Sequence, residues 1–153
     1  MRICSRNIRK LVHHVDDVIR WDYDVLCLQE TDVPEYEVGS VTNTLKAHGF
    51  NIIWADPTNL SRGGHGRRAA IVVKGPTPPV SPTRLIDGDA KWLRASGRWV
   101  ECLVPCPKGS GHIHISCFYG ISGASDRTTM EHKRIEVIFA AAMVRMDQYN
   151  RNP

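Results

Sequence analysis

The stretch Asp24-Val25-Leu26-Cys27-Leu28-Gln29-Glu30-Thr31 decides the fold. Its four consecutive apolar residues, 25–28, predict a strand that is covered on both faces, as in the sheets of α/β proteins. A polar tail that contains Gln29 and Glu30 follows at once. Ligands of open α/β sheets bind where strands end and loops begin. The stretch therefore predicts an α/β fold with a candidate site at the end of this strand.

The flanking segments alternate between strand and helix patterns. Residues 1–8 predict a short first strand, and apolar residues at 11, 15, 18 and 19 form one stripe of a helix. A second helix is expected around Val41 and Leu45. Further strands are expected at 51–54, 69–73, 99–104 and 112–119, with a glycine-rich loop at 56–68, a proline-rich loop at 74–89 and a long C-terminal helix marked by Ile135, Ile138, Phe139, Ala142 and Met146.

Composition and length indicate one globular domain over residues 1–153. Hydrophobic residues make up 42% and charged residues 24%, which excludes a disordered or fibrous chain. No apolar run approaches the roughly 20 residues of a membrane span. Residues 1–60 carry more acidic than basic side chains, whereas residues 61–153 carry 14 basic and 7 acidic ones. A basic second part favours a polyanionic partner such as nucleic acid, although scattered solvated charge explains the same count.

The cysteines predict an intracellular, reducing environment. Their number is odd, five, and no secretory signal precedes them. Cys4, Cys27 and Cys117 lie in apolar runs and are expected to be small buried hydrophobes. Cys102 and Cys106 could form a four-ligand zinc site with two nearby histidines, but the alternation with isoleucine there favours a strand.

Two predicted strands end in side chains that a core does not require. The first ends at Asn7 and the second at Glu30. A carboxylate and a carboxamide brought together by neighbouring strands form a hard oxygen site, and Mg²⁺ is held by one or two carboxylates plus waters and substrate phosphates. Both side chains could equally serve only to cap or solvate the strand ends.

The same residues resemble the endonuclease/exonuclease/phosphatase family, the metal-dependent phosphodiesterases that include apurinic endonucleases and deoxyribonuclease I. Residues 24–31 resemble its Leu-Gln-Glu motif. Residues 3–8 resemble the first strand that ends in a metal-site Asn, residues 62–66 and 69–73 the glycine-rich loop and following strand, and residues 115–120 the strand that ends in the active-site Tyr. The glycine-rich and basic composition is most similar to endonucleases of retroelements.

The resemblance implies a fold, a cofactor and a site. The fold is the N-terminal half of a two-sheet α/β sandwich flanked by helices. Asn7 and Glu30 would hold Mg²⁺ (or Mn²⁺), and Tyr119 would act near the phosphate. Arg62, Arg67 and Arg68, from the glycine-rich segment, are the candidate nucleic-acid-binding residues.

The chain departs from the family pattern in its later motifs. Gly88-Asp89-Ala90 lacks the apolar strand that precedes the family's Gly-Asp-x-Asn motif, and Ser125-Asp126-Arg127 lacks the His of its Ser-Asp-His motif. His65, His112 and His114 could replace that His only by residue type. The resemblance thus covers about the first half of the family's domain.

Three functions remain open on sequence grounds. The first is a Mg²⁺-dependent endonuclease-like phosphodiesterase that is truncated and inactive alone. The second is a non-catalytic remnant that binds nucleic acid, and the third is a phosphatase of a small phosphorylated substrate. Because the family's second half supplies the facing sheet, we also expect an open apolar face at Cys4, Val25, Cys27, Ile71, Val73 and Cys117, with self-association through it.

Overall fold

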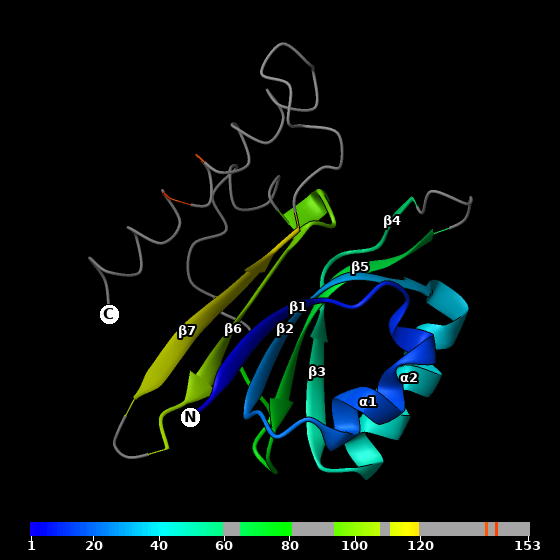
Figure 1. Ribbon diagram of the computed structural model, residues 1–153. Coiled ribbons are helices and arrows are strands. Elements are labelled where there is room, and N and C mark those ends of the chain that lie inside the picture. Colours follow the sequence, from blue (N-terminus) through cyan, green and yellow to red (C-terminus); the bar gives the residue numbers. More distant parts are fainter. Residues whose placement is uncertain (60–64, 81–93, 108–110, 120–139, 141–142, 144–153) are drawn as a thin grey trace.

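A computed structural model of the chain describes residues 1–59, 65–80, 94–107, 111–119, 140 and 143. Two sheets and two helices form its core (Figure 1). The elements follow in the order β1 (Ile3–Asn7), η1 (Leu11–His13), α1 (Val15–Arg20), β2 (Val25–Pro34), α2 (Glu35–Ala47), β3 (Phe50–Trp54), β4 (Thr58–Asn59), β5 (His65–Lys74), β6 (Trp99–Pro105) and β7 (His112–Phe118). The expected C-terminal helix lies outside the described residues, apart from Ala140 and Met143.

The larger sheet has the strand order β1-β2-β5-β3, with β4 added beside β5. β1 runs parallel to β2, whereas β5 is antiparallel to β2, β3 and β4. A parallel pair needs a crossover, which η1 and α1 supply. The smaller sheet is the antiparallel ribbon β6–β7, as the sequence predicts.

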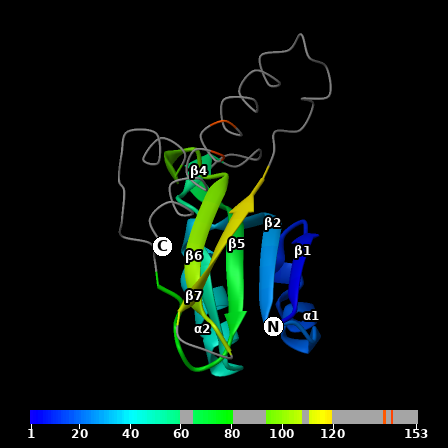
Figure 2. The ribbon, with the colours of Figure 1, turned by 90° about the vertical axis from the view of Figure 1, so that its left-hand side faces the viewer.

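The central strand β2 is buried on both faces, as its continuous apolar run predicts. Leu26 and Leu28 lie in a core that includes Val18 of α1 and Leu45 of α2. Val25 and Cys27 lie in a second core, formed between the two sheets. The molecule is therefore layered as helices, large sheet and ribbon (Figures 1 and 2). This arrangement confirms the expected α/β sandwich.

The expectation of an open apolar face is wrong for five of its six residues. Val25, Cys27, Ile71, Val73 and Cys117 are all buried in the core between the sheets. The ribbon β6–β7 supplies the facing layer through Val100, Cys102, Val104 and Ile115. Cys4 is half-buried and packs against the helix-side core. Residues within the first 119 thus cover this face without a second half.

Several element boundaries differ from the predicted ones. α2 begins at Glu35, well before the expected apolar pair, and η1 precedes a separate α1 where one helix is expected. β5 begins at His65 because β4 and the end of β2 provide it with backbone partners. No helix in the described part of the chain is long and apolar enough to cross a membrane.

Candidate functional site

The end of β1 lies beside the part of β2 that carries Gln29 and Glu30, and this part of the large sheet is here called the rim. The prediction that the second strand ends at Glu30 is wrong, because β2 continues to Pro34 through its pairing with β5. Asn7 pairs with Gln29, the residue before Glu30. The backbone N–H of Ile8 donates to Gln29 O at 2.9 Å, and that of Lys10 donates to Glu30 O at 2.9 Å. These hydrogen bonds fix the backbone of Asn7 beside that of Glu30. The expectation that both lie at one rim is confirmed.

The rim backbone is strained. A β-bulge shifts the pairing of β2 with β5 between Gln29 and Val33. Within the described residues, the non-glycine positions with positive φ all lie here: Arg9 at 41°, Lys10 at 69°, Glu30 at 53° and Asp32 at 41°. Such conformations each cost about 1–3 kcal/mol and cluster at functional sites.

Thr31 anchors the bulge between the two carboxylates. Its side chain is fully buried, and its hydroxyl donates to Arg67 O of β5 at 2.8 Å. Glu30 and Asp32, on either side of Thr31, lie at the accessible edge, where 25% and 35% of their side chains are exposed.

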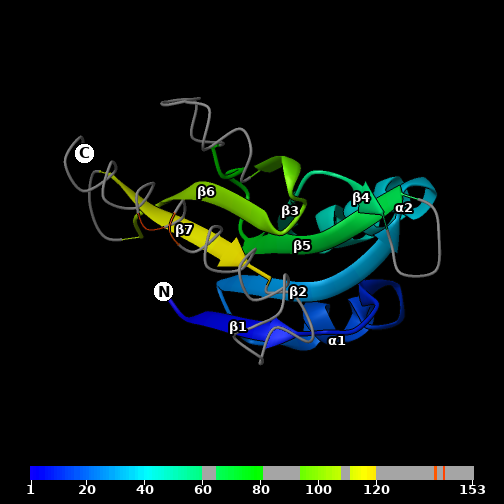
Figure 3. The same ribbon diagram turned by 90° about the horizontal axis from the view of Figure 1, so that it is seen from above.

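Tyr119 reaches the rim from the second sheet. It follows β7, and its backbone N–H donates to Arg98 O at 2.9 Å. Its hydroxyl donates to Oε1 of Glu30 at 3.3 Å, while Oε2 of Glu30 lies 3.7 Å from Nε of Arg9. The structure thus brings together Asn7 of β1, Glu30 of β2 and Tyr119, which follows β7. Figure 3 shows β1 and β2 side by side in the large sheet, seen from above.

Gln29 ties the rim to the core between the sheets. Its amide nitrogen Nε2 donates to Ser5 Oγ at 2.9 Å and to Cys117 Sγ at 3.4 Å. A hydrogen bond with Cys27 and burial raise the pKa of Cys117 well above its ordinary value. Burial raises the pKa of Cys102 to about 12. Because the thiolate is the nucleophilic form, these two thiols are poor candidates for covalent catalysis.

The three predicted nucleic-acid-binding arginines differ in their surroundings. Arg67 is held by Glu35, with Nε–Oε2 and Nη2–Oε1 distances of 3.0 and 2.8 Å, and by Ala55 O. Arg68 points towards the rim, its Nε 3.9 Å from Asp32 Oδ1. Arg62 lies outside the described residues. Their binding of nucleic acid stays a prediction, and the geometry favours Arg68 over Arg67.

Sequence reasoning misses three rim residues, Arg9, Asp32 and Arg98. The guanidinium carbon of Arg98 lies 4.9 Å from the centre of the Tyr119 ring. Burial, followed by the positive charge of Arg68, lowers the pKa of Arg98. For Asp32, the spacing of two from Glu30 is the one available signal. Nothing in the local sequence points to Arg98, which reaches the rim only because β6 pairs with β7.

Neither His112 nor His114 lies at the rim, and the side chain of His65, the third candidate, is outside the described part of the structure. Nε2 of His114 lies 3.0 Å from Oε2 of buried Glu101, whose other oxygen accepts from Arg94 at 2.8 Å. His114 and Glu101 alternate with Ile115 and Cys102, which face the core, and so lie on the ribbon's other face. His112 is exposed at the far end of β7. The motifs at 88–90 and 125–127 lie outside the described residues.

The rim offers oxygen donors of the kind that Mg²⁺ prefers. The carboxylate of Glu30 is partly exposed, and the amide of Asn7 is carried by the adjacent strand. Among the described residues, no three His, Cys, Asp or Glu side chains cluster closely enough to hold a metal ion. A site built on one or two carboxylates, with water and substrate oxygens completing the shell, fits Mg²⁺ rather than zinc.

Comparison with known proteins finds structural likeness only. No protein-family model matches the chain, and no curated protein matches it. Two crystal structures of ANGEL2, described as a 2',3'-cyclic phosphatase, are similar to it. The structure with adenosine-2',3'-vanadate gives a TM-score of 0.44 at 21% identity over 76% of this chain, and the other 0.42 at 20% identity over 72%. This chain spans about a third of the length of those chains, 33% and 31%.

Proposed function

We propose that this chain carries the metal- and phosphate-binding part of a divalent-metal-dependent phosphodiesterase that acts on nucleic acid. The observation that supports the proposal most is the convergence of Asn7, Glu30 and Tyr119 on the rim. These residues are separated by 23 and 89 positions in the chain, yet pairing of β1 with β2 and the Tyr119–Glu30 hydrogen bond bring them together. Backbone strain at the same rim supports a functional role.

Each residue has a distinct part in the proposed chemistry. Glu30 and Asn7 would provide protein oxygens to Mg²⁺ or Mn²⁺, and the ion, when bound, offsets negative charge on phosphoryl oxygens. Tyr119 donates its hydroxyl hydrogen bond to Oε1 of Glu30 and would thereby orient this carboxylate. Its hydroxyl would also donate to a phosphoryl oxygen of the substrate.

Nucleophile activation has no counterpart among the described residues. The charged groups paired at the rim are Arg9 with Glu30 and Arg68 with Asp32, and neither pair assigns a group that would activate water. We therefore expect the chain by itself to nick plasmid DNA at background rate with Mg²⁺. Nicking above background that disappears in Glu30→Gln and with chelator would show that these residues suffice for catalysis.

Two alternatives make different predictions for the same protein. If the chain only binds nucleic acid, it should bind an oligonucleotide but no divalent ion at the rim. The basic side chains of Arg9, Arg68 and Arg98 favour this alternative. A phosphatase of small substrates takes up the ion but binds a phosphomonoester as well as an oligonucleotide.

Calorimetric titration with Mn²⁺ tests the proposal directly. We expect Glu30→Gln to weaken Mn²⁺ binding at least about tenfold, because the ion would lose the carboxylate ligand that the proposal assigns to it. Asp16→Asn, which removes an exposed carboxylate of α1, is the matched control and should bind as the unaltered protein does. Equal Mn²⁺ affinity in all three proteins would overturn the proposal.

A further inference from the structure

The ion pair between Arg9 and Glu30 at the rim is loose. Nε of Arg9 lies 3.7 Å from Oε2 of Glu30, longer than a close charge-assisted hydrogen bond. The pair of Arg67 with Glu35, by contrast, has two contacts, at 3.0 and 2.8 Å. Exposure widens the difference, since 87% of the Arg9 side chain is exposed against 19% of the Arg67 side chain. Exposed pairs with a single contact contribute little to stability, so the Arg9–Glu30 pair breaks at low cost.

The backbone that carries Arg9 is fixed beside Glu30, while the Arg9 side chain lies in solvent. Arg9 stands between two residues whose N–H groups donate to β2. The N–H of Ile8 donates to Gln29 O, and the N–H of Lys10 donates to Glu30 O, both at 2.9 Å. The guanidinium group can therefore change its partner while the backbone stays in place.

The two oxygens of the Glu30 carboxylate have different partners. Oε1 accepts a hydrogen bond from the neutral hydroxyl of Tyr119 at 3.3 Å, whereas Oε2 faces the positive charge of Arg9. A guanidinium group within 4 Å of this carboxylate opposes the binding of a metal ion there, because like charges repel. Among the described residues, Arg9 is the cation paired with Glu30. It is therefore the group with which a divalent ion must compete.

A substrate phosphate at the rim would offer Arg9 a second anion. Mg²⁺ sites in proteins are completed by water and by phosphate oxygens of the substrate. A phosphate beside an ion held by Glu30 is within reach of the long, exposed side chain of Arg9. The planar guanidinium fork matches phosphate geometry, with two N–H groups donating to two oxygens. The negative charge that Arg9 loses at Glu30 is thus replaced at the phosphate.

We propose that Arg9 is a substrate-positioning residue that exchanges partners. It pairs with Glu30 in the metal-free protein and with a phosphoryl oxygen of the nucleotide chain once a divalent ion is bound at the rim. The inference rests on the proposed function, to which it adds a coupling between the two ligands. Because the ion releases Arg9 for the phosphate, the phosphate in turn strengthens the binding of the ion by the same factor.

Calorimetric titration with Mn²⁺ in the absence of nucleic acid tests the first half of the exchange. We expect Arg9→Gln to tighten Mn²⁺ binding about fourfold, because it removes an exposed competing charge. Arg9→Lys keeps the charge and should bind Mn²⁺ as the unaltered protein does. Lys10→Gln is the matched control, since it removes the same charge from the next residue, which is also exposed and forms no ion pair in the described part of the chain. A change in Arg9→Gln no larger than that in Lys10→Gln would overturn the proposal.

Oligonucleotide binding tests the second half. The full chain is titrated into a short fluorescent oligothymidylate, and the anisotropy is followed with saturating Mn²⁺ and, separately, with excess chelator. With Mn²⁺, Arg9→Gln should weaken binding about tenfold, the effect of losing a hydrogen bond between charged groups, and Arg9→Lys should recover part of the loss. With chelator the loss should be much smaller, because Glu30 then holds the guanidinium group. An equal loss in the two conditions would overturn the exchange.

The combined outcomes separate this inference from the proposed function. If Glu30→Gln weakens Mn²⁺ binding and Arg9→Gln leaves it unchanged, the metal site is supported and the exchange is wrong. If neither substitution alters Mn²⁺ binding, both are wrong. Tighter Mn²⁺ binding together with weaker, metal-dependent oligonucleotide binding in Arg9→Gln supports the exchange, and a merely structural role of Arg9 predicts neither. Because the side chains of Arg9 and Lys10 are exposed, their substitution leaves the core intact.

Discussion

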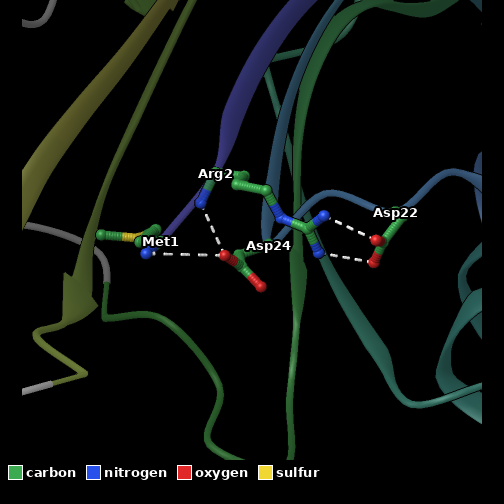
Figure 4. A network of polar contacts seen from close by, with 4 residues as sticks. All are labelled: Met1, Arg2, Asp22 and Asp24. Carbon is green, nitrogen blue, oxygen red and sulfur yellow. Dashed lines mark hydrogen bonds and ion pairs between the residues drawn. The ribbon is translucent and has the colours of Figure 1, made fainter.

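The two ends of the β1–β2 pair differ in how their charges are paired and in their backbone conformation. At the start of β1, called the base, opposite charges meet (Figure 4): the Arg2 guanidinium donates to both carboxylate oxygens of Asp22, and the backbone N–H of Arg2 donates to Asp24 at 2.6 Å. The N-terminal ammonium group lies 3.7 Å from the same Asp24 oxygen. At the rim, the ion pairs of Glu30 with Arg9 and of Asp32 with Arg68 are longer than the guanidinium pair of the base, at 3.7 and 3.9 Å.

Backbone conformation separates the two ends as clearly as charge does. Four non-glycine residues with positive φ lie at the rim, and none of the described non-glycine residues at the base has one. The base thus pairs its charges and keeps ordinary backbone conformations, whereas the rim holds strained backbone. This difference fits a base that sets the register of β1 and a rim that, as we propose, binds a ligand.

The largest expected difference between the rim and the base is in metal affinity, which Tyr119→Phe at the rim should lower. Loss of the hydroxyl removes the hydrogen bond that orients Glu30, and loss of such a supporting contact typically weakens metal binding 10- to 100-fold. We expect Mn²⁺ affinity to fall about tenfold. Tyr23→Phe, next to the base in the helix-side core, should leave it unchanged. Equal Mn²⁺ affinity in the two variants would contradict the assigned role of Tyr119.

A glycine substitution at the rim should stabilise the protein. Lys10 has φ of 69° and ψ of 80°, which glycine adopts without the steric cost of a Cβ atom. We expect Lys10→Gly to raise the free energy of unfolding by about 1 kcal/mol in urea titrations. Lys46→Gly, in the last turn of α2, should lower it by about the same amount. A loss of stability in Lys10→Gly would show that the rim is not strained there.

The smallest expected effect concerns acid stability at the base. The hydrogen bond and charge of Arg2 lower the pKa of Asp22 from 3.8. The folded state therefore binds the proton less readily than the unfolded state, so this contribution to stability is present above about pH 4 and is lost as the pH falls below it. Because the pair is exposed, the effect is small and screened by salt.

A pH series of melting temperatures for Asp22→Asn checks this contribution. The variant should melt slightly below the unaltered protein at pH 7, and the difference should vanish near pH 2 and in 1 M salt. A difference that persists at pH 2 would assign the effect to something other than the carboxylate charge.

Local pattern was sufficient to predict the buried part of β2, but not its continuation to Pro34. Residues 25–28 could be assigned without tertiary information, because a continuous apolar run requires cover on both faces. The prediction that Asn7, Glu30 and Tyr119 belong to one site was based on the order of the motifs along the chain rather than on any one spacing. Their convergence depends on strand pairing that no local pattern contains.

The features that sequence reasoning missed all arise from tertiary contacts. The bulge at residues 29–33 depends on the burial of Thr31 against β5. Because this is a tertiary contact, no glycine or other turn residue in the sequence indicates the bulge. The ribbon β6–β7 covers the inner face of the large sheet, an arrangement that alternation in 99–104 and 112–119 allows but does not specify. Arg98 joins the site as a consequence of that packing.

Paramagnetic broadening by Mn²⁺ in amide NMR spectra tests the central claim, that the rim is a metal site, most directly. The ion broadens signals of nearby nuclei, so trace Mn²⁺ should first erase the amide signals of Asn7, Ile8, Glu30 and Tyr119, and Glu30→Gln should restore them. The base residues Arg2 and Asp24 should be unaffected. Broadening centred instead on Asp16 and Glu37, which line a groove between α1 and α2, or unchanged by Glu30→Gln, would contradict the account.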